Sequence, residues 1–224
     1  DQESPMSTNS TAYAAPAISG LAGAAASQDG STTEGGTVMQ LQGTNFGPSG
    51  TPVSAVYGPA GDNSKYTAQS CQVLGHTSIE CETVEGTGRG LQWSVTAGGQ
   101  SSATFTGESM TYADPVVDSV KGDSPMRTDG TSSLIITGRN FGGLCIDCVT
   151  GKYGGPSGTK YGPVHCSVTT AHKEIRCRTA AGVGRDHRWV VTRDSLTSVM
   201  SSAFSSYAAP SIDSNGLSGD AMSA

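Results

Sequence analysis

Six cysteines are the residues of this chain whose type and spacing could do chemistry, and they occur as three close pairs. The pairs are Cys71 with Cys81, Cys166 with Cys177, and Cys145 with Cys148. Closely spaced thiols can form a disulfide, hold a metal ion or act as a redox centre. Which chemistry applies depends on the elements that carry each pair.

The first two pairs lie on short runs of alternating apolar residues joined by a turn. Cys71 and Cys81 flank Gly75-His76-Thr77, and Cys166 and Cys177 flank Thr170-Ala171-His172. A hairpin of this kind brings cross-strand Cβ atoms close to disulfide range. Closing a loop of about ten residues contributes on the order of 2–3 kcal/mol to stability. We therefore predict two structural disulfides, Cys71–Cys81 and Cys166–Cys177.

The third pair forms a Cys-x-x-Cys motif, Cys145-Ile146-Asp147-Cys148. A redox centre of this type is normally placed at a helix N-terminus, and the sequence indicates no helix here. A zinc site would need His165 and Cys166 as further ligands, but the position of Cys166 already has a partner in the pattern above. The motif therefore favours a local disulfide that ties a loop, with zinc as the alternative.

No other group of residues forms a catalytic pattern. The four histidines match no catalytic constellation, and the glycine-rich segments 86–90 and 182–185 lie between expected strands rather than before a helix that could bind phosphate. Asp62-Asn63-Ser64 and the Asp123 to Asp129 segment are typical of turns, with calcium as the lesser reading. We predict a protein that is not an enzyme and needs no cofactor or metal.

The elements around the cysteines occur twice. Gly43-Thr44-Asn45-Phe46-Gly47 returns 95 residues later as Gly138-Arg139-Asn140-Phe141-Gly142, and Trp93 and Tyr112-Ala113-x-Pro115 return as Trp189 and Tyr207-Ala208-x-Pro210. A fixed offset over many landmarks indicates a tandem array of one folding unit. We expect a terminal strand or linker of a preceding unit at 1–14, one domain at 15–113, a second at 114–209, and the start of a following unit or a flexible tail at 210–224.

Each repeat contains about seven short β-type runs and no sustained helical period. In the first repeat they include Thr37–Leu41, Val53–Tyr57, Ser70–Leu74, Ser78–Glu82, Gln92–Thr96 and Ala103–Thr106; in the second they include Ser133–Thr137, Cys148–Tyr153, His165–Thr169, Glu174–Arg178, Arg188–Thr192 and Ser202–Ser206. This spacing predicts an all-β protein of two tandem immunoglobulin-like β-sandwiches. Trp93 and Trp189 should fill the cores, and Phe46 and Phe141 should plug the sandwich ends.

The repeat resembles the IPT/TIG domain. The likeness rests on Pro-x-Ile/Val at the start, Gly-Gly-Thr or Asp-Gly-Thr before a strand, Gly-x-Asn-Phe-Gly, the Cys pair, Gly-x-Gly and the final Tyr-x-x-Pro, and it covers residues 15 to about 209. The resemblance implies an immunoglobulin-like fold. It does not choose a function, because this module serves adhesion, signalling and DNA binding.

Composition narrows the setting. The net charge of −6 and the paired cysteines count against a DNA-binding module and favour an oxidising, extracellular or cell-surface location. No apolar run approaches the length of a membrane span, so we expect no membrane insertion by this segment. Asn9-Ser10-Thr11 is an N-glycosylation sequon, so Asn9 is a candidate glycan site.

Charge is distributed unequally between the repeats. Residues 15–113 carry seven acidic and two basic residues, a net charge of −5, whereas residues 114–209 carry eight acidic and eleven basic residues, a net charge of +3. Opposite charge on two copies of one fold suits head-to-tail association with copies of the same chain. The favoured function is a structural subunit of a surface filament or tandem-domain array, and the alternative is a receptor or adhesin ectodomain that binds a protein or glycan ligand.

Overall fold

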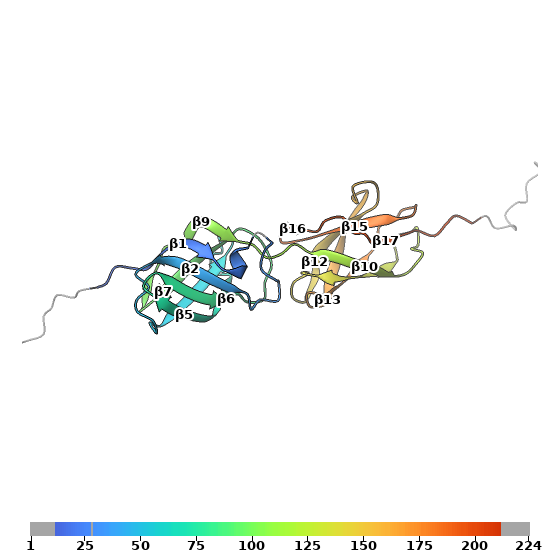
Figure 1. The fold of residues 1–224 in the computed structure, drawn as a ribbon. Coiled ribbons are helices and arrows are strands. Elements are labelled where there is room, and N and C mark those ends of the chain that lie inside the picture. Colours follow the sequence, from blue (N-terminus) through green and yellow to red (C-terminus); the bar gives the residue numbers. More distant parts are fainter. Residues whose placement is uncertain (1–11, 28, 212–224) are drawn as a thin grey trace, which may run out of the picture. The chain divides into compact units, whose positions relative to one another are not determined.

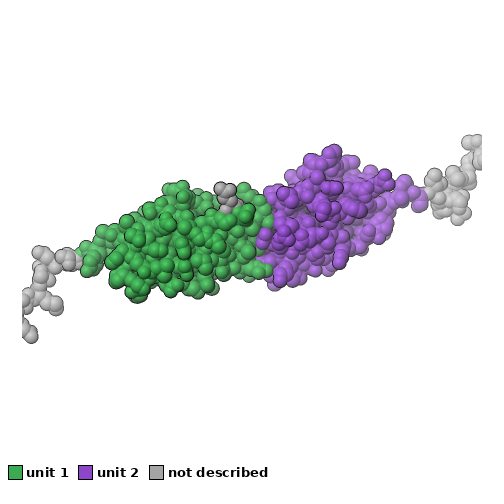
Figure 2. Space-filling model, in the orientation of Figure 1, with its two compact units in different colours: residues 1–114, 194–196 green, residues 115–193, 197–224 purple. Residues whose placement is uncertain are grey.

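The computed structural model describes residues 12–27 and 29–211. The chain divides into unit 1, residues 1–114 with 194–196, and unit 2, residues 115–193 with 197–224 (Figure 2). The described residues are almost entirely strands and turns, with a single short 3-10 helix, η1 (Ala24–Ala26). The all-β prediction is confirmed, and each unit is an immunoglobulin-like sandwich.

Unit 1 consists of two antiparallel sheets (Figure 1). The first has the order β1 (Ala17–Ala22), β2 (Val38–Thr44), β6 (Ser78–Glu82) and β5 (Gln69–Gly75). The second has the order β4 (Tyr66–Thr67), β3 (Val53–Gly58), β7 (Leu91–Ala97) and β8 (Gln100–Ser101), with β9 (Phe105–Met110) paired to β7.

Unit 2 uses the same strands but joins them into one continuous sheet. The order is β10 (Val116–Gly122), β11 (Ser133–Arg139), β14 (Glu174–Arg178), β13 (Tyr161–Thr170), β12 (Cys145–Tyr153), β15 (His187–Arg193) and β16 (Leu196–Thr197), with β17 (Phe204–Ser205) paired to β15. The junction is β13, which is uninterrupted where unit 1 has the separate strands β4 and β5. β12 pairs with both β13 and β15 and so links the two halves.

The buried core of each unit follows from the alternation of its strands. Every second residue of β7 is buried, and the same alternation buries His187, Trp189 and Val191 of its counterpart β15. Trp93 and Trp189 therefore lie inside the sandwiches with no exposed surface. Each indole stacks on a tyrosine ring, with centroids 4.3 Å apart for Trp93 and Tyr57 and 4.2 Å apart for Trp189 and Tyr153. The prediction that the two tryptophans occupy equivalent buried positions is confirmed.

The Gly-x-Asn-Phe-Gly motif closes one end of each sandwich. A Cβ atom on Gly43 or Gly138 would lie about 2 Å from a backbone carbonyl oxygen of the first strand, so only glycine fits. Asn45 and Asn140 both have a φ of 63°, in the left-handed region that Asn tolerates well. This turn directs Phe46 and Phe141 into the core, where both are fully buried as predicted.

Most strands extend beyond the expected ranges, as β12 and β13 do, and the last strand of each unit is displaced or shortened. The last strand of unit 1 is Phe105–Met110 rather than Ala103–Thr106, because Ser102 bonds back to Val95 through its N–H and its hydroxyl. The last strand of unit 2 is only Phe204–Ser205, because Ser198 and Ser201 already bond the β15 backbone. Their hydroxyls accept the N–H groups of Val191 and Trp189, and their N–H groups donate to the carbonyl oxygens of the same two residues. Residues 12–16 are not a strand in the described structure.

Candidate functional site: the disulfide loop and the Tyr-Ala-x-Pro surfaces

The structure joins all six cysteines in the three pairs named above, and no cysteine is free. Cys71–Cys81 links β5 to β6 with 4.1 Å between Cα atoms, and Cys166–Cys177 links β13 to β14 with 4.2 Å. Cys81, Cys166 and Cys177 are fully buried. These two bonds therefore lie inside the sandwiches and have a structural role.

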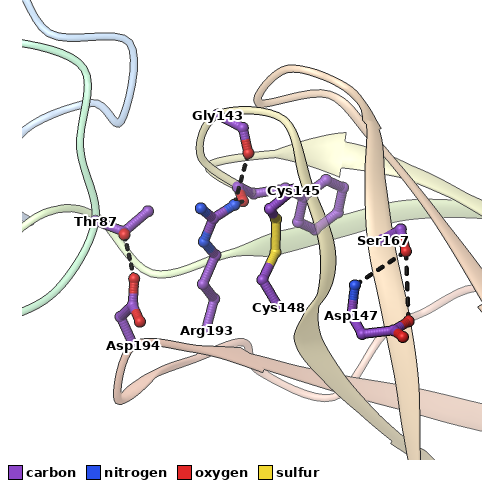
Figure 3. Close-up of a disulfide and its surroundings, with 9 residues drawn as sticks. Thr87, Gly143, Cys145, Asp147, Cys148, Ser167, Arg193 and Asp194 are labelled. Atoms are coloured by element: carbon purple, nitrogen blue, oxygen red, sulfur yellow. Dashed lines mark hydrogen bonds between the residues drawn. A yellow bond between two sulfur atoms is a disulfide. The ribbon is translucent and has the colours of Figure 1, made fainter.

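Cys145–Cys148 lies at the start of β12 and ties a surface loop (Figure 3). Asp147, with a φ of 52°, lies where the register between β12 and β13 shifts, and its N–H donates to the Ser167 hydroxyl of β13 at 3.0 Å. The Arg193 guanidinium donates to the carbonyl oxygens of Phe141 and Gly143 at 2.5 and 2.9 Å, which fixes the segment leading into the loop. The described residues contain no cluster of three or more His, Cys, Asp or Glu arranged for a metal ion.

This loop presents two apolar side chains to solvent. Leu144 is 70% exposed and Ile146 is 86% exposed. The disulfide and the hydrogen bonds described above constrain the backbone that carries this exposed apolar pair. Unit 1 has no cysteines at these positions, so the feature belongs to unit 2 alone.

A tyrosine network that the sequence analysis missed seals the opposite end of each sandwich. In unit 1 the Tyr112 hydroxyl donates to the Val84 carbonyl oxygen at 2.6 Å and lies 2.8 Å from the Tyr57 hydroxyl, which accepts the Val84 N–H at 2.9 Å. The same arrangement returns in unit 2 with Tyr207, Tyr153 and Ala180, at 2.7, 2.7 and 2.8 Å. The signal that could have found it is the recurrence of Tyr57 and Tyr66 as Tyr153 and Tyr161.

The third tyrosine of each network holds the Gly-x-Gly loop. The Tyr66 hydroxyl donates to the Thr87 carbonyl oxygen at 2.9 Å, and the Tyr161 hydroxyl donates to the Val183 carbonyl oxygen at 2.8 Å. A Cβ atom on Gly86 would lie 2.6 Å from the Tyr112 hydroxyl oxygen. A Cβ atom on Gly182 would likewise lie 2.7 Å from the Tyr207 hydroxyl oxygen, so ring packing requires the first glycine of each Gly-x-Gly loop, in agreement with the reading of these segments as turns between strands.

The network changes the acidity of its tyrosines. Burial raises the pKa of Tyr57 and Tyr112 above the ordinary value, and it raises the pKa of Tyr153 and Tyr207 in the same way. The hydrogen bond with the Val183 backbone lowers the pKa of the more exposed Tyr161. The buried hydroxyls thus act as neutral structural donors and acceptors.

The carboxylates of the Asp123 to Asp129 segment, considered for calcium, are satisfied by the protein itself. Asp129 accepts hydrogen bonds from the Thr131 N–H and hydroxyl and from Arg127, and these bonds lower the pKa of its carboxyl to about 2. Asp123 accepts the Ser133 N–H at 3.0 Å. Both carboxylates therefore serve turn structure, as the sequence indicated. Asn9, the expected glycan site, lies outside the described residues.

The Tyr-Ala-x-Pro motif occurs three times, and its tyrosine is buried in two copies and exposed in the third. Tyr112 and Tyr207 are 1% and 5% exposed, whereas Tyr13, in Tyr13-Ala14-Ala15-Pro16, is 94% exposed. Tyr13 borders a hollow of about 470 Å³ on unit 1, lined also by Asn45, Phe46 and His76. On unit 2, the residues Tyr207 to Pro210 border a hollow of about 590 Å³ together with Val183 and Arg185.

No helix among the described residues is long and apolar enough to span a membrane. No protein-family model and no curated protein matches the sequence.

Several solved structures are similar to this chain over most of its length. The extracellular region of plexin A4, domains 1 to 8, is 14% identical with a TM-score of 0.36, over 86% of this chain and 18% of that one. The Yersinia pseudotuberculosis adhesin InvE is 13% identical with a TM-score of 0.44, over 80% of this chain and 56% of that one. Chicken CNTN1 domains FN1–FN3 are 10% identical with a TM-score of 0.28, over 88% and 68%. The chain thus spans less than two thirds of the plexin and adhesin chains, and these likenesses carry no argument about function.

Proposed function

We propose that this chain is a non-enzymatic extracellular structural protein, a subunit of a surface filament or tandem-domain array that joins copies of itself head to tail. Both units are proposed to be of the IPT/TIG type, on the motifs described above. The three disulfides support an oxidising, extracellular setting. Glycans at Asn9 and on the Ser/Thr-rich edges would suit such a surface protein.

The exposure of Tyr13 is the observation that carries the proposal. In the other two copies of Tyr-Ala-x-Pro, the tyrosine is buried in one sandwich and hydrogen-bonded to a second core tyrosine. The proline of the middle copy, Pro115, then leads directly into the first strand of the next sandwich. The tyrosine of the motif therefore packs in one sandwich while its proline begins the next sandwich. Among the described residues, Pro16 begins a sandwich but Tyr13 packs in none.

The two hollows supply surfaces for such a joint. The unit 2 hollow contains Tyr207, Ala208 and Pro210, whose counterparts Tyr112, Ala113 and Pro115 lead from one sandwich to the next within the chain. In unit 1, Arg89 pairs with Asp114 at 2.9 Å. The counterparts in unit 2 are Arg185 and Ala209, so the carboxylate of that pair is absent, and the highly exposed Arg185 lies 3.7 Å from the carboxylate of its neighbour Asp186. We propose that the Tyr13 surface of one copy docks at the Tyr207–Pro210 surface of another.

Deletion of residues 1–14 tests this proposal. Negative-stain electron microscopy of the full chain should show fibres, and the deletion should abolish or shorten them. Circular dichroism and thermal unfolding should stay unchanged, because the sandwich cores begin at β1. The control is Leu74→Ala, which removes another exposed apolar side chain, on β5, and should leave fibres intact. If the deleted protein assembles as the full chain does, head-to-tail joining through this segment is wrong.

A receptor or adhesin ectodomain is the second candidate, and the Cys145–Cys148 loop favours it. Leu144 and Ile146 form an exposed apolar pair that neither sandwich core uses. If the full chain stays monomeric at high concentration, this candidate becomes the better account. Leu144→Ser with Ile146→Ser should then reduce binding to cells or glycan arrays.

A further inference from the structure

Two equivalent strands carry opposite charges at the same positions. On β6 of unit 1 the outward residues are Ser78, Glu80 and Glu82, and 96 positions later on β14 of unit 2 they are Glu174, Arg176 and Arg178, so the charge is inverted at two of the three positions. In both strands the charged residues alternate with buried ones, Ile79 and Cys81 in unit 1 and Ile175 and Cys177 in unit 2. The charges therefore lie on the outer faces of corresponding sheets.

The neighbouring strands extend the difference. In unit 1 the register partners of Glu80 are Gln40 and Gln72, which are uncharged. In unit 2 the partners of Arg176 are Ile135 and Ser167, and Ile135 is opposite Lys121 on the edge strand β10. We call Glu80 and Glu82 the acidic face, and Lys121, Arg176 and Arg178 the basic face.

The charges on both faces are available. Glu80 and Glu82 accept hydrogen bonds only from neutral side chains, Gln72 at 3.5 Å and Ser70 at 3.0 Å. Neither Arg176 nor Arg178, both exposed, forms an ion pair with another residue in the described part of the chain. Glu174, which shares the outward face of β14, accepts a hydrogen bond from the Thr169 hydroxyl at 2.6 Å and forms no ion pair with either arginine among the described residues.

We propose that the acidic face of one copy docks against the basic face of a second copy of this chain. Residues two apart on a strand are about 7 Å apart, so both glutamates can meet both arginines at once. Acidic faces repel each other and so do basic faces, which selects the pairing of unit 1 with unit 2 over that of like units. Exposed ion pairs add little affinity singly, so the faces set the partner and its orientation.

This side-by-side contact goes beyond head-to-tail joining and does not rest on it. End-to-end joining lengthens a particle, whereas pairing through sheet faces widens it. The end surfaces at Tyr13 and at Tyr207–Pro210 contain none of the charged residues of the two faces. Charge changes on the faces therefore leave end-to-end joining unchanged, and the two proposals can fail separately.

The test uses charge reversal in the full chain. The first variant, Glu80→Arg with Glu82→Arg, has two basic faces, and the second, Arg176→Glu with Arg178→Glu, has two acidic faces. A third variant carries all four changes and restores one face of each sign. The control, Lys152→Glu with Arg188→Glu, matches the charge change of the second variant on the exposed side of β12 and β15. Sedimentation velocity and particle widths in negative stain measure lateral association.

At low salt the wild type should associate laterally, and about 1 M salt, where the Debye length is about 3 Å, should dissociate it. Each of the first two variants alone should associate about tenfold more weakly or worse, while their equimolar mixture and the fourfold variant should recover wild-type association. The control should behave as wild type. The proposal is overturned if reversal has no effect, if the mixture and the fourfold variant fail to recover, or if the control is equally weakened.

Discussion

Replacing Gly86 with alanine should test whether ring packing, rather than ligand binding, explains the Gly-x-Gly loops. The new Cβ atom would lie 2.6 Å from the Tyr112 hydroxyl oxygen and 2.7 Å from its ring carbon Cζ. Tyr112 cannot move freely, because it is 1% exposed and its hydroxyl bonds both Tyr57 and Val84. Overpacking of this kind costs roughly 1–3 kcal/mol. For a sandwich of about 100 residues, each kcal/mol lowers Tm by roughly 4–8 °C.

Gly75→Ala is the matched control, because a Cβ atom there meets no atom within 4 Å. Gly75 is the last residue of β5 in unit 1, and, like that of Gly86, its φ lies outside the left-handed region, so this change should alter stability by no more than about 0.5 kcal/mol. Urea unfolding monitored by tryptophan fluorescence and calorimetry measures both variants. The reasoning is refuted if Gly86→Ala is as stable as the wild type, or if Gly75→Ala is destabilised to the same extent.

Three further predictions concern the disulfides and the two groups of shifted pKa. Replacing Cys71 and Cys81 together with serine should lower the free energy of unfolding by at least about 2–3 kcal/mol, whereas the same change at Cys145 and Cys148 should cost less, because that loop is shorter; chemical unfolding of both double variants decides this. Burial raises the pKa of Tyr57 and Tyr112, so the folded state retains protons that the unfolded state loses above pH about 10. The free energy of unfolding should therefore fall as pH rises beyond that value, by up to about 1.4 kcal/mol per pH unit for each tyrosine. Tyr112→Phe should reduce this slope in urea titrations from pH about 9 to 11. The pKa of Asp129 is lowered to about 2, so its contribution is present above pH about 4 and is lost as pH falls toward 2; Asp129→Asn should flatten this part of a thermal-unfolding pH profile, and an unchanged profile would contradict the assignment.

The sequence predicted strand bounds best where a turn and a cysteine lie close to the strand. Ser78–Glu82 and Glu174–Arg178 coincide with β6 and β14, because a turn precedes each strand and a cysteine fixes its inward parity. Trp93 and Trp189 were placed correctly for the same reason, since alternation on a central strand leaves one buried face.

What could not be predicted depends on pairing between distant residues. β13 runs through Gly162-Pro163, a pair that reads as a break, and the strand continues because the register with β12 shifts there. The tyrosine hydroxyls meet across more than fifty residues of sequence, so no local pattern reports them. The Tyr-Ala-x-Pro motif was visible as a repeat landmark, but only burial distinguishes Tyr13 from its two counterparts.

The two units share the disulfide, tryptophan and tyrosines of their cores but differ in the charge of outward residues on β6 and β14. This difference follows from what each position contacts. The buried partners of a disulfide, a stacked tryptophan and a tyrosine network constrain one another, so a change at one site costs stability at several. Outward residues of β6 and β14 contact solvent and their immediate strand neighbours, so fold stability alone leaves their charge free to vary. Glu80 and Glu82 nevertheless stand where Arg176 and Arg178 stand, with Lys121 adding to the second set, whereas Ser78 is matched by the acidic Glu174. An inversion of charge at two neighbouring outward positions is the pattern expected where one face recognises the other.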